Sequence, residues 1–124
     1  PVPQPPDPVR GLLHNGAHVV LFAGLAAALA LAFARRRGPH VERLRPAVAF
    51  GLAALYGVVD EWHQSHVPGR TCSVVDVLSD VLGAALGLML LQRFLFRSGF
   101  GIAAHAIVGL AALGSVALAT FGPW

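Results

Sequence analysis

The stretch DEWHQSHVPGR, residues 60–70, gathers side chains that could do chemistry between two long apolar runs. It offers carboxylates, imidazoles, an amide and a guanidinium to a ligand. Carboxylates and imidazoles serve as general acids and bases, and a guanidinium holds phosphate or carboxylate with its fork of donors. We therefore take this stretch as the centre of a candidate site, and ask which elements position it.

The composition places that stretch in a membrane protein. Of the 124 residues, 56% are hydrophobic and only 12% are charged, and the mean hydropathy is +0.67. A water-soluble domain of this size could not cover so much apolar surface with polar groups. The single cysteine, Cys72, cannot form a disulfide within the chain and leaves the redox compartment undecided.

Four apolar segments cover most of the chain, at residues 9–34, 46–62, 74–96 and 102–121. A membrane-spanning helix needs about 20 residues, and these alanine- and leucine-rich runs lack the alternation of barrel strands. We predict an all-α polytopic membrane protein, a bundle of four transmembrane helices. Residues 9–124 form its single domain, and the proline-rich residues 1–8 form a flexible lead-in. Because the sequence begins without methionine, we expect a trimmed or partial chain.

The positions of the arginines predict an orientation in a bacterial cell membrane. One side of the predicted bundle carries Arg10 and Arg70; the other carries Arg35, Arg36, Arg37, Arg43, Arg45, Arg93 and Arg97. Positive charge favours the cytoplasmic side, so both termini and residues 63–73 are expected outside. A patch for anionic lipid or nucleic acid is the alternative interpretation of the three consecutive arginines, but orientation explains them better. We expect no nucleic-acid partner.

Two carboxylates and two glycines share one stripe of the third segment. Asp76, Asp80, Gly83 and Gly87 are spaced by four, three and four residues, which places them on one helix face. The glycines form a surface that another helix can approach closely. Asp80 lies roughly 9 Å inside the span. An ionised carboxylate facing lipid there costs about 3 kcal/mol, so Asp80 should face the bundle interior.

Polar groups on the first two segments should reach the same level. His14 and His18 are four residues apart and share a helix face. Either one suits a ligand, a proton carrier or a hydrogen bond between helices. Asp60 and Glu61 end the second segment, where the helix dipole disfavours anions, so they need a cation, metal or proton. Arg70 is the nearest candidate, and an ion pair that only ties down the loop is the structural alternative.

These residues resemble the signature of the VanZ-like family of small bacterial membrane proteins, named for a teicoplanin-resistance protein. The family pattern D-E-x-x-Q, R, D-x-x-x-N-x-x-G-x-x-x-G is similar in every spacing to Asp60, Glu61, Gln64, Arg70, Asp76, Asp80, Gly83 and Gly87. Residues 15–22 are similar to an earlier element, D-K-x-x-H-x-x-x-Y/F, with His18 and Phe22 in register. Two departures matter: Asp80 stands where the family has asparagine, and the earlier element lacks its lysine.

The resemblance implies an integral membrane protein that reduces the action of glycopeptide antibiotics such as teicoplanin. The residues themselves leave three hypotheses open. In the first, an outward-facing polar cavity binds the head group of a cell-envelope lipid or its antibiotic complex. Arg70 would hold phosphate or carboxylate and His18 would exchange a proton. The candidate binding residues are Arg70, Gln64, Glu61, Asp60, Asp76, Asp80, His18 and His14.

The second hypothesis is a metal- or acid-base-dependent enzyme that modifies a lipid-linked cell-wall precursor. Its catalytic candidates are Asp60, Glu61, His18 and Asp76, and a divalent cation could be held by Asp76 and Asp80. The third hypothesis is a structural polar network that supports a partner protein. The oligomeric state stays open, because the small residues of the fourth segment can pack within or between subunits.

Overall fold

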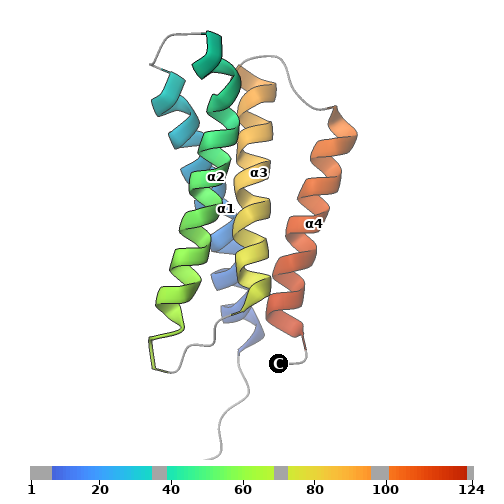
Figure 1. The fold of residues 1–124 in the computed structure, drawn as a ribbon. Coiled ribbons are helices and arrows are strands. Elements are labelled where there is room, and N and C mark those ends of the chain that lie inside the picture. Colours follow the sequence, from blue (N-terminus) through green and yellow to red (C-terminus); the bar gives the residue numbers. More distant parts are fainter. Residues whose placement is uncertain (1–6, 35–38, 69–72, 96–100, 123–124) are drawn as a thin grey trace, which may run out of the picture.

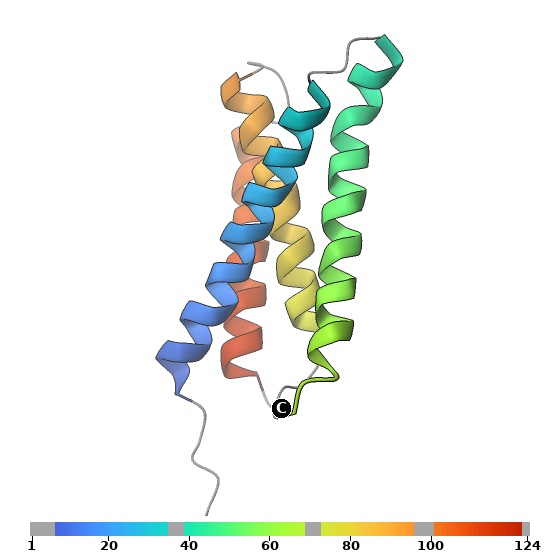
Figure 2. The same ribbon diagram turned by 90° about the vertical axis from the view of Figure 1, so that its left-hand side faces the viewer.

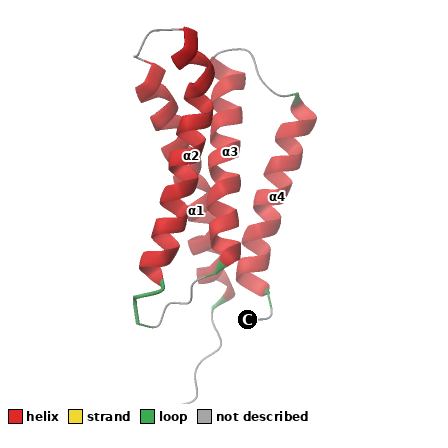
Figure 3. Ribbon diagram, viewed as in Figure 1, coloured by secondary structure: helices red, strands yellow, loops and turns green. Residues whose placement is uncertain are grey.

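The computed structural model describes residues 7–34, 39–68, 73–95 and 101–122. Its helices are α1 (Pro8–Ala34), α2 (Pro39–Gln64), α3 (Val74–Leu95) and α4 (Ile102–Phe121). Within these described ranges every regular element is a helix (Figure 3). The prediction of an all-α, four-helix bundle is confirmed.

The predicted segment boundaries agree closely with the helices, except at the start of α2. The sequence placed that start at Pro46, but α2 begins at Pro39 and contains Pro46. A proline at the first position of a helix lacks only a hydrogen that would have no partner there. Pro46 removes one hydrogen bond and the helix continues through it, so proline was misleading as a boundary.

The helices run alternately up and down, with α3 in the middle. Figures 1 and 2 show α1, α2 and α3 packed together and α4 against the other flank of α3. In the described part of the chain, α3 contacts all three other helices, and α1 also contacts α2 and α4. One end of the bundle, drawn at the bottom of Figure 1, holds the starts of α1 and α3 and the ends of α2 and α4.

Length and composition identify membrane spans among the described helices. Three are long and apolar enough to cross a membrane: Pro8–Ala34, Val74–Phe94 and Ile102–Phe121. α2 is equally long but less apolar, since it includes arginines near its start and Asp60 and Glu61 near its end. Its outer face still exposes large apolar side chains such as Leu55 and Val58. Such a surface is unfavourable in water and suits lipid.

Small residues let the helices approach closely. A Cβ added at Gly83 would lie 2.9 Å from Val19 Cα, and one at Gly87 would lie 2.6 Å from Ala23 Cα, so both glycines of α3 contact the backbone of α1. The prediction of close packing at this stripe is confirmed. The core beyond it is also built from small side chains with one leucine: Ala26, Ala30, Ala49, Ala53, Ala84 and Leu88.

Candidate functional site

A buried contact between α1 and α3 forms the centre of the site. His18 Nδ1 lies 2.9 Å from Asp80 Oδ1. The Asp80 side chain is fully buried, and the His18 side chain is 14% exposed. When Asp80 is ionised it can only accept a hydrogen bond; Nδ1 is then the donor, and Nε2 is left for another partner. The close approach at Gly83, one helical turn along α3, brings the two side chains together.

Helix α2 also packs against Asp80, at Gly57. A Cβ added at Gly57 would lie 3.1 Å from Asp80 Oδ2 and 3.3 Å from Phe22 Cε1. The missing side chain therefore lets α2 reach the carboxylate. Asp80 Oδ2 is buried and has no hydrogen-bond partner. Gly57 was not anticipated, although its spacing of four residues before Glu61 puts both on one face of α2.

Glu61 joins the end of α2 to the start of α3. The side chain is 2% exposed, and its Oε2 accepts a hydrogen bond of 2.9 Å from the Ser73 N–H. Ser73 also caps α3, because its Oγ accepts a 3.2 Å hydrogen bond from the Val75 N–H. The second carboxylate oxygen, Glu61 Oε1, is buried without a hydrogen-bond partner.

Asp60 and Gln64 extend the polar group toward the end of the bundle. Gln64 Nε2 donates a 2.7 Å hydrogen bond to Asp60 Oδ2, within one turn of α2. Asp76 is half-buried one turn from Asp80, on the same face of α3. We call this set the polar end: His14, His18, Asp60, Glu61, Gln64, Ser73, Asp76 and Asp80.

Aromatic rings continue from the polar end into the bundle. The His14 and His18 ring centroids are 5.0 Å apart, and His18 stacks on Phe22 at 6.2 Å. Phe22 in turn lies 6.1 Å from the ring of Tyr56 on α2. His14 is exposed, so this column leads from the surface to the buried His18–Asp80 contact.

Two predicted features of the site are not brought together by the described residues. Arg70 lies outside them, and its role stays a prediction. In the described ranges no group of three or more His, Cys, Asp or Glu side chains is arranged to hold a metal ion. Of the pair predicted to hold a cation, Asp76 and Asp80, the second contacts His18 through Oδ1, and the cation site stays a prediction.

Further polar contacts, not anticipated from the sequence, attach α4. Asn15 Nδ2 donates a 3.1 Å hydrogen bond to Thr120 Oγ1, and Ser79 Oγ lies 2.9 Å from Ser115 Oγ. Both serines are buried. The sequence did carry a signal for these contacts. Each residue is a single polar group inside an apolar run, and such groups often form hydrogen bonds between helices in lipid.

A cavity of about 520 Å³ lies between α1, α3 and α4. Leu12, Gly16 and Val20 line it from α1, Leu86 from α3 and Leu113 from α4, and its whole lining is apolar. Gly16 is two residues from His18, which turns it to roughly the opposite face of α1. The cavity therefore suits a hydrocarbon chain rather than a polar group.

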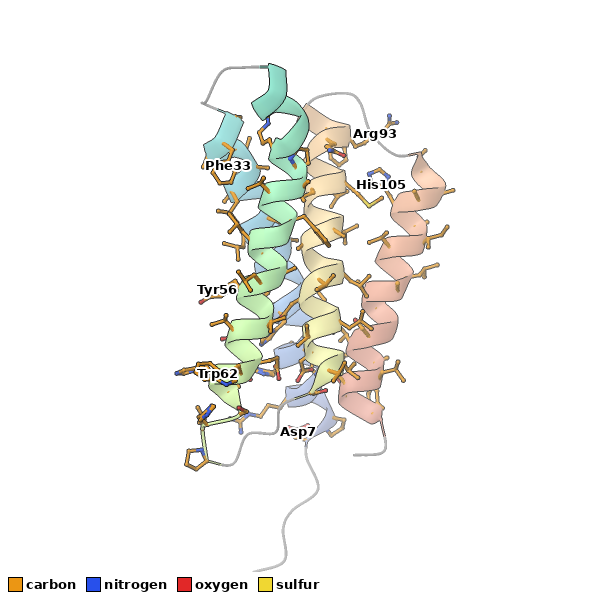
Figure 4. The ribbon with its side chains drawn as sticks, viewed as in Figure 1. Asp7, Phe33, Tyr56, Trp62, Arg93 and His105 are labelled. Atoms are coloured by element: carbon orange, nitrogen blue, oxygen red, sulfur yellow. The ribbon has the colours of Figure 1, made fainter. Side chains whose placement is uncertain are left out.

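The two ends of the bundle differ in charge. Figure 4 shows Asp7 and Trp62 near the polar end, and Arg93 and His105 at the opposite end. The carboxylates and imidazoles that α1, α2 and α3 contribute lie together at the polar end. The fold and this site define a helical membrane protein with a buried polar network.

The family follows from comparison with known sequences. The family model described as VanZ/LLP1 matches residues 3–97, and the chain belongs to this family. The matched residues include α1, α2 and α3, which carry the polar end, whereas α4 lies beyond them. No curated protein and no solved structure matches the chain.

Proposed function

We propose that the protein binds the head group of a cell-envelope lipid, or of a lipid-linked cell-wall precursor, at its polar end. The polar end faces outward in a bacterial cell membrane, and this binding reduces the action of glycopeptide antibiotics such as teicoplanin. The observation that carries the proposal is the contact between His18 and Asp80, with Glu61 buried beside it from a third helix. The three helices α1, α2 and α3 contribute ionisable groups to one level.

The energetic balance favours a binding role over a purely structural network. Hydrogen bonds between membrane helices contribute about 0.6 kcal/mol each, whereas a charged side chain inside a span costs about 3 kcal/mol. Glu61 and Asp80 each leave one buried oxygen without a donor, which adds a further cost. A network that served only stability would not need these unsatisfied groups.

We infer different tasks for the residues at different depths of the polar end. His14 is exposed and lies against His18, so α1 places two imidazole rings where a group arriving from outside would meet them. Asp60 and Gln64 form the outer acceptor and donor pair. Arg70, in the adjoining connection, supplies the guanidinium that would hold a phosphate or carboxylate of the same head group.

Drug susceptibility at matched protein abundance tests this function. Arg70→Ala should lower protection against teicoplanin, while Arg93→Ala, at the opposite end of the bundle, should leave it unchanged. Immunoblots of the membrane fraction control for abundance. Unchanged protection in Arg70→Ala cells with normal abundance would exclude the role of Arg70.

An acid-base membrane enzyme is the second candidate function. It is favoured by one observation: a fully buried carboxylate holds His18 Nδ1. In acid-base catalysis such a contact fixes the imidazole, and Nε2 then moves the proton. Incubation of purified protein with lipid-linked precursors, followed by product analysis, separates the two functions. Turnover that His18→Gln abolishes supports the enzyme, and its absence across these lipids favours binding alone.

A further inference from the structure

We infer that the head group bound at the polar end carries an ammonium group, and that Glu61 Oε1 accepts its N–H. This inference rests on the proposed function and names the chemical class of its ligand. It depends on three observations: two buried oxygens that lack donors, the short separation of the two carboxylates that carry them, and the number of ligands that converge there.

The two oxygens without donors lie along the same contact between α2 and α3. Glu61 is four residues after Gly57, the residue that faces Asp80 Oδ2, so both carboxylates lie on this contact about one helical turn, or 6 Å, apart. Their side chains are 2% and 0% exposed. A buried acceptor without a donor costs about 1–3 kcal/mol. A ligand that donates hydrogen bonds removes that cost.

The charge around these oxygens selects a cation. Glu61 and Asp80 are both buried on this contact, and the described side chain that contacts Asp80 by a hydrogen bond is His18. Carboxylates at such short range raise one another's free energy when ionised, and an anionic ligand placed among them would raise it further. A cationic donor instead lowers it.

The number of ligands favours ammonium over a divalent metal. Calcium takes six to eight oxygen ligands and magnesium requires octahedral geometry. Across the described ranges no three His, Cys, Asp or Glu side chains converge for a metal. An ammonium group makes directional N–H···O bonds and is satisfied by one or two carboxylate oxygens with ordinary acceptors around them.

Lipids of defined head group test the inference with the full chain. Purified protein is placed in nanodiscs of phosphatidylcholine containing either phosphatidylethanolamine or phosphatidylglycerol, and retained lipid is counted by native mass spectrometry. Phosphatidylcholine has a quaternary cation without N–H donors. We expect phosphatidylethanolamine to be retained about tenfold over both others, the size of one charge-assisted hydrogen bond.

A matched pair of variants separates binding from folding. Glu61→Gln keeps an oxygen for the Ser73 N–H and places its own amide donor where Oε1 lies, so it should melt at the same or a higher temperature. It should nevertheless lose the tenfold preference. Asp7→Asn changes an exposed carboxylate at the start of α1 and should keep the preference. The wild-type comparison of the three lipids stands even where a variant folds poorly.

The outcomes distinguish this inference from the proposed function. Selective retention of phosphatidylglycerol, unaffected by Glu61→Gln, would overturn the ammonium assignment while head-group binding stands. Equal retention of all three lipids, with no binding of free phosphoethanolamine, would overturn both. Free phosphoethanolamine is added as a competitor: binding of this compound without any lipid preference would support the ammonium group and assign it to a soluble ligand.

Discussion

His18 on α1 and Asp80 on α3 meet through a 2.9 Å contact between Nδ1 and Oδ1. The contact lies directly beside the stripe where Gly83 and Gly87 touch the backbone of α1. The geometry of the polar end therefore depends on how α1 packs against α3. The glycines set the distance between these two helices, and that distance allows His18 to reach Asp80.

Removing the Asp80 carboxylate should destabilise the bundle. Asp80→Ala leaves His18 without its acceptor and opens space beside Gly57, so we expect a loss of about 1–3 kcal/mol in unfolding free energy. Asp80→Asn keeps an oxygen for His18 and should cost less than half as much. Thermal unfolding in detergent measures both variants. Equal stability of Asp80→Ala and the wild type would contradict the importance of the contact.

Adding one methyl group at Gly83 should separate α1 from α3. The new Cβ would lie 2.5 Å from the Val19 carbonyl oxygen, and a backbone atom cannot move aside cheaply. We expect Gly83→Ala to cost about 1–3 kcal/mol. Gly51→Ala is the control, because its Cβ meets nothing within 4 Å. There alanine should be neutral or stabilise α2 by up to about 1 kcal/mol. The same effect in both variants would sink the packing argument.

Gly57→Ala should alter binding more than stability. Its Cβ would lie 3.1 Å from Asp80 Oδ2 and 3.3 Å from Phe22 Cε1, close enough to require shifts of a few tenths of an ångström in side chains. We expect less than about 1 kcal/mol of lost stability, together with a clear loss of lipid retention. Gly51→Ala on the same helix again serves as control. Retention equal to the wild type would show that α2 does not shape the site.

Cysteine labelling in intact cells should establish the orientation. In a Cys72→Ser background, Val67→Cys lies exposed at the polar end and Ala103→Cys lies exposed at the opposite end. A membrane-impermeant maleimide should label Val67→Cys directly and Ala103→Cys only after permeabilisation, because the arginine-rich end is expected in the cytoplasm. The reverse pattern would place the polar end on the cytoplasmic side, where it could not meet an antibiotic that acts at the cell surface.

The sequence predicted the helices well because their signals are local. Runs of apolar residues define the spans, and the spacing of Asp80, Gly83 and Gly87 defines one face of α3. The predicted start of α2 was wrong because the helix continues through Pro46. The pairing of His18 with Asp80 depends on how two helices pack. The sequence therefore predicted that both residues lie at one level, but not that they contact each other. Gly57 shares a face of α2 with Glu61, but only the packing of α2 on α3 shows that this face meets Asp80.

The composition of the lipid that copurifies with the protein tests the central claim most directly. Wild-type protein, His18→Gln and the exposed control His66→Gln are extracted from the same membranes, and their bound lipids are compared with the whole membrane by mass spectrometry. One head-group class should be enriched on the wild type and on His66→Gln, and the enrichment should disappear in His18→Gln. Lipid on all three proteins that matches the bulk membrane would contradict head-group binding at the polar end.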